Sequence, residues 1–311
     1  MSRWYAHGWN TATSLRLILT ITPRVPRRIV PVLGAVTAAI CLAVMKRERQ
    51  AAIRNLRRVL RRGGWPLYRV VWGLFYNFGR FMASYCELRS MTPESLEPRL
   101  ARDPPGEKRL REALEQGSGA LVLTAHLGNW EVGTLALQGI GRPVLVAMQV
   151  ERTNAAERWL NRLRVNGGVR VLRVGRDPAS ALVLRAALAR SEIVAMQGDR
   201  ATGDRVVEVG LFGAPFRFPL GPFLLAYGCD VPMVPTFVVQ EGWWRWRSEV
   251  GEPVRFPRTS DRGADIAAGV AQYAAQLEQA VRRHPDQWFN FYDLWSSTRS
   301  ALSNRDGPAP A

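Results

Sequence analysis

The chain has 311 residues, of which 47% are hydrophobic, and a formal net charge of +17 at pH 7. The length allows one large domain or two small ones, and the apolar share is ordinary for a globular protein. The positive charge implies an anionic partner, which could be nucleic acid, an anionic membrane surface or an acidic substrate. The three cysteines are widely spaced and match no zinc or redox motif.

An uncharged apolar run from Ile29 to Met45 dominates the N-terminal region. As a helix it would be about 25 Å long, slightly short of the roughly 30 Å hydrocarbon core of a bilayer. We interpret it as a marginal membrane-spanning helix, with an interfacial helix, or a helical hairpin with residues 15–21, as alternatives. Basic residues at both ends leave its orientation undecided. A cleaved signal peptide fits less well because a basic helix follows.

Residues 50–62 have apolar side chains at helical spacing and five arginines on the remaining surface. Such a basic amphipathic helix fits anionic lipid headgroups, and the alternative is a surface helix of a soluble protein. Residues 67–88 predict a further helix that is packed on most sides or lies against lipid. We find no zinc knuckle, P-loop or ribonucleoprotein motif, which argues against nucleic acid as the partner.

The centre of the chain has the pattern of an active site. Residues 120–125 form an apolar run of strand type, and His126 follows directly. Gly128 and Asn129 permit a tight turn, Asn129 fits a helix N-cap, and Glu131 lies in the first turn of the next helix. Since ligands collect at the carboxyl ends of strands in open α/β sheets, we expect His126 and Glu131 to form a catalytic dyad.

In that dyad, Glu131 would hold one imidazole nitrogen and leave the other to take a hydroxyl proton. The alternative is a buried structural histidine with an unrelated glutamate. Residues 192–196 predict another strand, which ends in Gly198, Asp199 and Arg200, so we expect Asp199 and Arg200 near His126 at the sheet edge. The alternative interpretation is that Asp199 and Arg200 form a salt bridge in a turn at the surface.

Strand and helix signals alternate from residue 120 to residue 239. We predict further strands at residues 143–150, 169–174 and 231–239, a hairpin at 206–218, and helices at 108–116, 154–163, from 221, and 262–283. The polar stretch 91–105 is typical of a linker. This order predicts an α/β fold with a mixed, mainly parallel sheet flanked by helices, preceded by an N-terminal helical membrane anchor.

The segment from His126 to Glu131, HLGNWE, resembles the H-x4-D/E motif of glycerolipid acyltransferases in the form of the lipid A late acyltransferase family. Residues 196–200 and 207–237 are similar to later conserved regions of that family, and the resemblance covers nearly the whole chain. An isolated H-x4-E is a weak signal, but its ordered combination with Gly-Asp-Arg and Phe-Pro-x-Gly-Pro is specific. The aromatic run 288–295 departs from the more basic end of typical lipid A enzymes and leaves the acceptor open.

The resemblance implies a membrane-bound O-acyltransferase on the cytoplasmic face of a bacterial inner membrane, single-pass or monotopic. It would transfer a fatty acyl group from an acyl carrier protein or coenzyme A thioester to a hydroxyl of a lipid A precursor or related glycolipid. His126 would be the general base and Glu131 its partner. The candidate substrate-binding residues are Asn129, Arg164, Asp199 and Arg200.

No metal or other cofactor is expected, because no residue cluster has ligand spacing. We assign residues 1–62 to the membrane-anchoring region, 63–300 to the acyltransferase domain and 301–311 to a disordered tail. Phe212, Phe216 and Phe218 would line an acyl-chain groove or, by default, belong to the core. Two alternatives stay open: a lysophospholipid or phosphatidylinositol mannoside as acceptor, or a non-catalytic Arg-rich protein that binds anionic lipid or nucleic acid.

Overall fold

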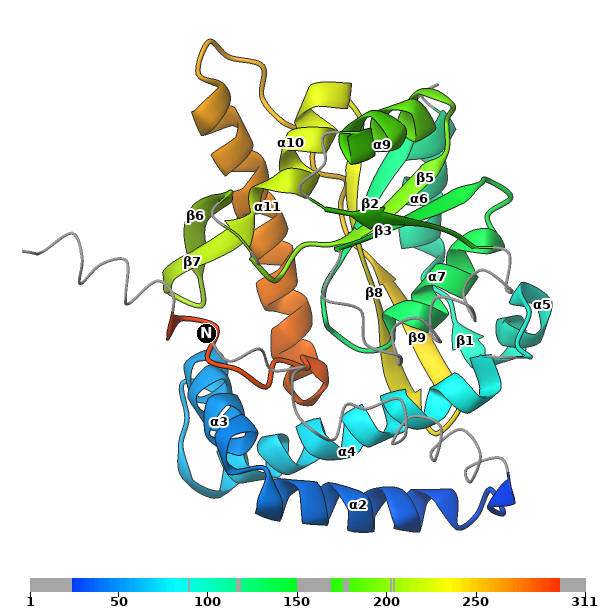
Figure 1. The fold of residues 1–311 in the computed structure, drawn as a ribbon, viewed down its shortest axis with the longest axis vertical. Coiled ribbons are helices and arrows are strands. Elements are labelled where there is room, and N and C mark those ends of the chain that lie inside the picture. The colour runs from blue at the N-terminus through cyan, green and yellow to red at the C-terminus, as the bar shows by residue number, and fades with distance from the viewer. Residues whose placement is uncertain are drawn as a thin grey trace, which may run out of the picture.

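The computed structural model describes residues 24–88, 90–115, 119–149, 169–175, 179–201, 203 and 205–296. A seven-stranded sheet in the order β1-β9-β8-β2-β5-β3-β4 forms its centre (Figure 1). The strands are β1 (Leu100–Ala101), β2 (Ala120–Thr124), β3 (Val144–Gln149), β4 (Arg170–Val174), β5 (Ile193–Gln197), β8 (Met233–Gly242) and β9 (Arg245–Val250). Only β9 and β1 run opposite to the rest. The predicted mixed, mainly parallel sheet is confirmed.

Helices cover both faces of this sheet. One face packs on α6 (Pro104–Glu115) and α7 (Trp130–Gln138), and the other on α9 (Ala179–Ala189), α10 (Leu220–Cys229) and α11 (Arg262–Arg283). Since successive strand residues point to opposite faces, Leu121 and Leu123 of β2 join the α10–α11 side, and Val122 joins the α6 side. Burial on both faces explains why the central strands are continuously apolar.

Most predicted elements are confirmed. The helix at 262–283 has the predicted bounds, and the predicted hairpin is β6 (Val206–Leu211) with β7 (Ala214–Pro219), a separate two-stranded sheet. The predicted helix at 154–163 lies outside the described residues. Helix α9 was not predicted.

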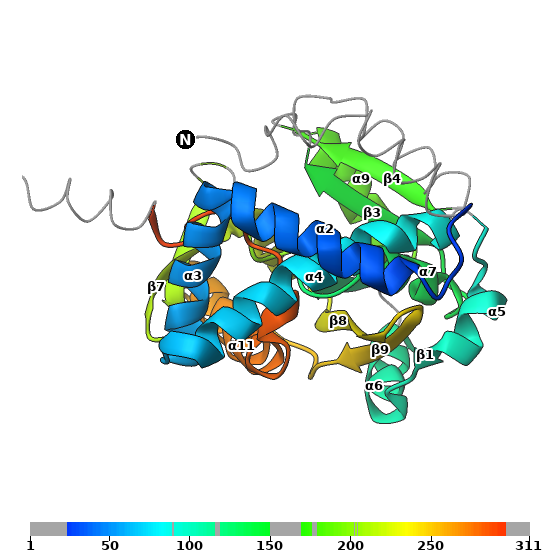
Figure 2. The same ribbon diagram turned by 90° about the horizontal axis from the view of Figure 1, so that it is seen from below.

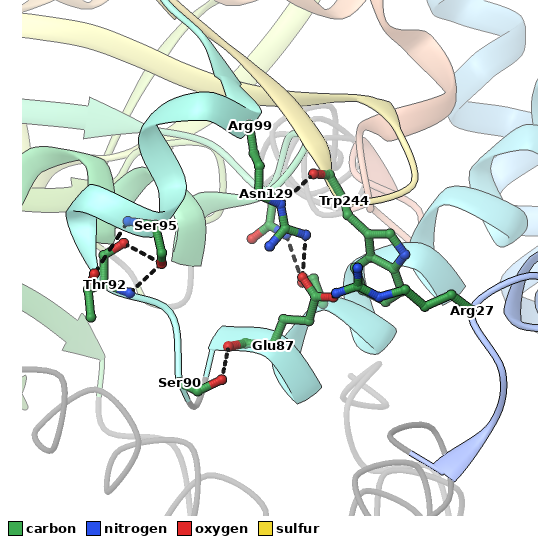
Figure 3. Close-up of polar contacts among 9 residues, drawn as sticks. Arg27, Glu87, Ser90, Thr92, Ser95, Arg99, Asn129 and Trp244 are labelled. Carbon is green, nitrogen blue, oxygen red and sulfur yellow. Dashed lines mark hydrogen bonds and ion pairs between the residues drawn. The ribbon is translucent and has the colours of Figure 1, made fainter.

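The prediction of a linker over 91–105 is wrong, because this stretch holds α5 (Pro93–Leu96), the 3-10 turn η2 (Glu97–Arg99), β1 and the start of α6. Local hydrogen bonds explain the extra structure. Thr92 and Ser95 form a reciprocal capping box, in which each side-chain oxygen accepts a bond from the other residue's backbone N–H (Figure 3).

Three N-terminal helices, α2 (Val30–Val44), α3 (Lys46–Leu60) and α4 (Gly64–Leu88), form a layer beside the sheet. Helix α2 lies across the outer side of α4 (Figures 1 and 2). At one end of this layer, Glu87 of α4 pairs with both Arg27 and Arg99, and Arg99 also donates to the carbonyl of Trp244 in the β8–β9 turn (Figure 3). These bonds connect the start of α2, the end of α4 and the end of β8.

No single helix of the described residues is both long and apolar enough to cross a membrane, although α2 and α3 meet the criteria as a pair bent by 94°. The predicted anchor is therefore not confirmed. The predicted boundary after residue 62 falls in the turn between α3 and α4. Both helices share one apolar cluster with Phe289 and Phe291 near the C-terminus. The division into domains stays a prediction.

Candidate active site

His126 lies where β2 has just left the sheet, in a turn held on two sides. The backbone N–H of Gly128 donates to the Gln287 carbonyl at 2.9 Å, and that of Asn129 donates to the Val238 carbonyl at 2.6 Å. Gly128 has a φ of +67°, and a Cβ there would lie 2.1 Å from the Val238 oxygen. Only glycine permits this close approach, so the turn that presents His126 depends on Gly128.

Asn129 is the N-cap of α7, as predicted, because its Oδ1 accepts a hydrogen bond from the Val132 N–H at 3.2 Å. Its Nδ2 donates to Ser84 Oγ of α4 at 2.8 Å, and the residue is fully buried. Both polar atoms of the side chain already have a partner within the protein. The structure therefore gives Asn129 a structural role, and substrate binding by Asn129 stays a prediction.

The imidazole of His126 is held by Asp199, which follows the neighbouring strand β5. Nδ1 and Asp199 Oδ1 are 2.7 Å apart, and the His126 backbone N–H donates to the same oxygen at 3.1 Å. Gly198, which precedes Asp199, packs against the Leu123 side chain, where a Cβ would lie 2.8 Å from Leu123 Cδ2. Asp199 is fully buried, so the alternative of a surface salt bridge is wrong.

Glu131 is buried beside this pair but does not hold the imidazole. Its Oε1 accepts hydrogen bonds from the Tyr85 hydroxyl of α4 and the Trp130 indole N–H, each at 3.1 Å. The indole of Trp130 in turn packs edge-on against the imidazole of His126, with ring centroids 5.2 Å apart. The carboxylate that contacts the imidazole is thus Asp199 and not Glu131 as we expected, and a catalytic role of Glu131 stays a prediction. Tyr85 of α4 and Trp130 of α7 donate to the Glu131 carboxylate and hold it away from the imidazole.

The segment after α11 completes the site, which sequence reasoning missed. Trp288 Nε1 and Asn290 Nδ2 donate to Asp199 Oδ2 at 3.0 and 3.4 Å, and the Phe289 N–H donates to the His126 carbonyl at 2.8 Å. The signal available in the sequence was a run of aromatic residues interrupted by Asn290 and Asp293, a composition typical of a buried segment with specific polar contacts.

Arg200 lies next to this segment, at the predicted edge of the sheet. Its Nε donates to Asn290 Oδ1 at 2.8 Å, its Nη2 donates to the Phe289 carbonyl at 2.5 Å, and its guanidinium lies 5.6 Å from the centre of the Tyr292 ring. These contacts orient the C-terminal segment. Substrate binding by Arg200 stays a prediction, and Arg164 lies outside the described residues.

The charges of the pair favour a neutral imidazole beside an ionised carboxylate. Burial and the positive charge of Arg200 lower the pKa of His126 to about 4, although Asp199 opposes this shift. Burial alone would raise the pKa of Asp199, but the side-chain and backbone hydrogen bonds from His126, together with the positive charge of Arg200, hold it well below its usual range. Nδ1–H therefore donates to Asp199, and Nε2 has a lone pair and no hydrogen-bond partner among the described residues.

The predicted acyl-chain groove and other possible centres can be compared with the part of the chain that the structure describes. Phe216 and Phe218 are fully buried and pack on Trp295 and Tyr273, so they belong to the core. A cavity of about 240 Å³ lies elsewhere, between β9 and α11, and Glu249 and Arg283 are part of its lining. Among the described residues, no group of three or more His, Cys, Asp or Glu side chains is placed to bind a metal.

Comparison with known proteins adds an independent result. The family model described as bacterial lipid A biosynthesis acyltransferase matches residues 3–297. The chain is 28% identical over 238 residues to a phosphatidylinositol mannoside acyltransferase of Mycobacterium tuberculosis (strain CDC 1551 / Oshkosh), covering 74% of this chain and 72% of that protein. It is 25% identical over 188 residues to the protein of the same name from Mycolicibacterium smegmatis, covering 60% of each.

Proposed function

Because the chain belongs to the bacterial lipid A biosynthesis acyltransferase family, we propose that it moves a fatty acyl group from a thioester to a glycolipid hydroxyl, with His126 as general base. The family predicted from the sequence motifs is confirmed, and the chain is an acyltransferase. The observation that carries the proposed mechanism is the 2.7 Å contact between His126 Nδ1 and Asp199, which leaves Nε2 to accept a proton.

In the proposed reaction the acceptor hydroxyl binds beside Nε2 of His126. Nε2 takes the hydroxyl proton while the oxygen attacks the thioester carbonyl carbon, so that a C–O bond forms and the carbonyl electrons move to oxygen. Asp199 stabilises the resulting imidazolium. The intermediate then collapses, the C–S bond breaks, and the imidazolium returns its proton to the departing thiolate. No acyl-enzyme is required.

The donor in this proposal is an acyl carrier protein or coenzyme A thioester. Both are anionic, and the net charge of +17 supports their attraction to the enzyme. For the acceptor, the names of the relatives favour phosphatidylinositol mannoside, and the name of the family favours a lipid A precursor. We propose the mannoside as the first acceptor to test, because those relatives match most of the chain. A lipid A precursor and a lysophospholipid are the second and third acceptors to test.

We also propose that the enzyme binds the cytoplasmic face of the inner membrane through the outer side of α2. This side exposes Val32, Val36, Ile40 and Val44 at helical spacing, with exposed fractions between 52% and 61%. Its inner side is buried against α4 at Ala38. Arginines precede α2, and the basic helix α3 follows it. A helix with one apolar side and basic residues before and after it is typical of a helix that lies in the membrane interface, so we favour this position over a membrane-spanning one.

The test of the proposed activity is an acyl-transfer assay in detergent micelles. Wild type, His126→Ala and Asp199→Asn would receive a labelled acyl thioester and the three acceptors, with products identified by mass spectrometry. We expect wild type to acylate one acceptor and His126→Ala to be slower by about two or more decades. Equal turnover by all three proteins would contradict the general-base assignment. Lipid binding without turnover would favour the non-catalytic alternative.

A further inference from the structure

Attack on a thioester places negative charge on the carbonyl oxygen, and an enzyme lowers this barrier with a donor directed at that oxygen. Three backbone donors of the turn that presents His126 already have acceptors within the protein. The backbone N–H groups of His126, Gly128 and Asn129 donate to Asp199, Gln287 and Val238 respectively. Arg200 donates to the C-terminal segment. A buried side-chain donor near the pair that lacks an acceptor within the protein is therefore a candidate for this role.

Gln197 has such a donor. Its side-chain Nε2 is buried and has no hydrogen-bond partner among the residues that the structure describes. Gln197 is the last residue of β5 and pairs in register with Thr124, the last residue of β2. It therefore lies opposite the strand end that carries His126 and two residues before Asp199. Other buried side-chain atoms without a partner belong to Arg80, Arg109, Ser248 and Trp295, which lie outside β2 and β5.

The alternation of side chains places Gln197 on the same face of the sheet as the imidazole. Within β5, Ile193 and Ala195 belong to the cluster on the α6 side, so Gln197 follows them on that side. Beyond β2, Ala125 and Leu127 point to the α11 side. His126, between these two residues, points the other way and contacts Trp130 of α7.

We propose that Gln197 is a catalytic residue whose Nε2 donates a hydrogen bond to the thioester carbonyl oxygen as it becomes an oxyanion. This inference rests on the proposed function. The carbonyl electrons move to the oxygen as the C–O bond forms, Nε2–H stabilises that charge, and the electrons return as the C–S bond breaks. A buried amide without a partner destabilises the free protein, and the substrate oxygen supplies the missing acceptor.

The proposal is tested with Gln197→Met, which keeps the length of the side chain and removes the donor. Ser248→Ala is the matched control, because it removes another buried polar atom without a partner, in β9. We expect Gln197→Met to lower kcat by about 100-fold or more with KM changed by less than about threefold. Its unfolding temperature should not fall, since the change removes an unsatisfied donor. Ser248→Ala should keep the wild-type kcat.

A second variant, Gln197→Glu, covers the case in which the methionine variant does not fold. It keeps the shape of the side chain, replaces the donor by an acceptor and should lower kcat at least as much. If either folded variant retains kcat within about threefold of wild type, the proposal is wrong even though the proposed function stands. If wild type transfers no acyl group while the same preparation is folded, the proposed function and this inference fail together.

Discussion

Asp199 is fully buried, yet it accepts hydrogen bonds from the backbone and imidazole of His126 and from the side chains of Trp288 and Asn290. Such a set keeps a carboxylate ionised and prevents its rotation. The sequence predicted that His126 and Asp199 lie near each other, because both follow predicted strands and were expected at the same edge of the sheet. It predicted Glu131 as the carboxylate that holds the imidazole, whereas the structure places Asp199 there. That choice depends on the Tyr85 hydroxyl, which reaches Glu131 from a helix distant in the sequence.

The two carboxylates should therefore differ in mutational effect. Asp199→Asn removes the acceptor that fixes the imidazole tautomer and stabilises the imidazolium, and we expect kcat to fall by about two or more decades. Glu131→Gln keeps an oxygen that accepts from Tyr85 and Trp130, and we expect a loss of less than about tenfold. Steady-state kinetics of both variants in one assay would measure the difference. The reverse order would restore Glu131 as the partner.

The pH dependence of kcat/KM reports the pKa of the same imidazole in the free enzyme. The general base must be unprotonated, so the rate rises with pH through that pKa and is level above it. Because the pKa of His126 is lowered to about 4, we expect a level profile from roughly pH 6 to pH 8 and a decline below about pH 5. A decline centred near pH 6.5, the value of an unperturbed imidazole, would contradict the buried, neutral state.

At the scale of elements, the turn from β2 to α7 is the part of the site that the sequence predicted best. Its glycine and N-cap act over a few residues, so local patterns identify them. The segment Trp288–Trp295 was noticed only as an unusual composition. Its role arises from contacts far apart in the chain, such as Asn55 Nδ2 of α3, which donates to the carbonyls of Asn290 and Tyr292. Such pairings leave no periodic signal in either partner.

Gly128→Ala tests the turn, and Gly141→Ala is its control. Both glycines have positive φ, +67° and +81°, but a Cβ at Gly141 meets no atom within 4 Å. The control should lose about 1–2 kcal/mol of stability from the left-handed backbone alone. Gly128→Ala should lose more and also lower kcat, because the clash with Val238 displaces His126. Thermal unfolding and kcat would be measured on both, and equal effects would mean that the turn tolerates a Cβ.

Across the whole molecule, α4 lies between the outer helix α2 and the catalytic turn. One side of α4 packs on α2, and Ser84 and Tyr85 contact Asn129 and Glu131. The C-terminal end of β8 contacts the same helix, where Arg80 donates a hydrogen bond to the carbonyl oxygen of Gly242. The carboxyl edge of the sheet therefore faces the helical layer (Figure 1). With α2 at a lipid surface, the site would lie one helix behind that surface, a suitable position for a lipid acceptor.

This arrangement predicts which apolar side chains matter for membrane binding. Val36→Glu with Ile40→Glu places two charges on the outer stripe of α2, where both side chains are more than half exposed, so folding should be preserved. Charges are costly in the apolar part of a bilayer, and we expect binding to vesicles of anionic lipid to fall by about tenfold or more. Leu182→Glu on α9 is the control, since Leu182 is 68% exposed and belongs to a helix on the sheet. Vesicle flotation would measure binding of all three proteins. Loss in the control alone, or no loss in the α2 variant, would mean that another surface of the enzyme binds the lipid.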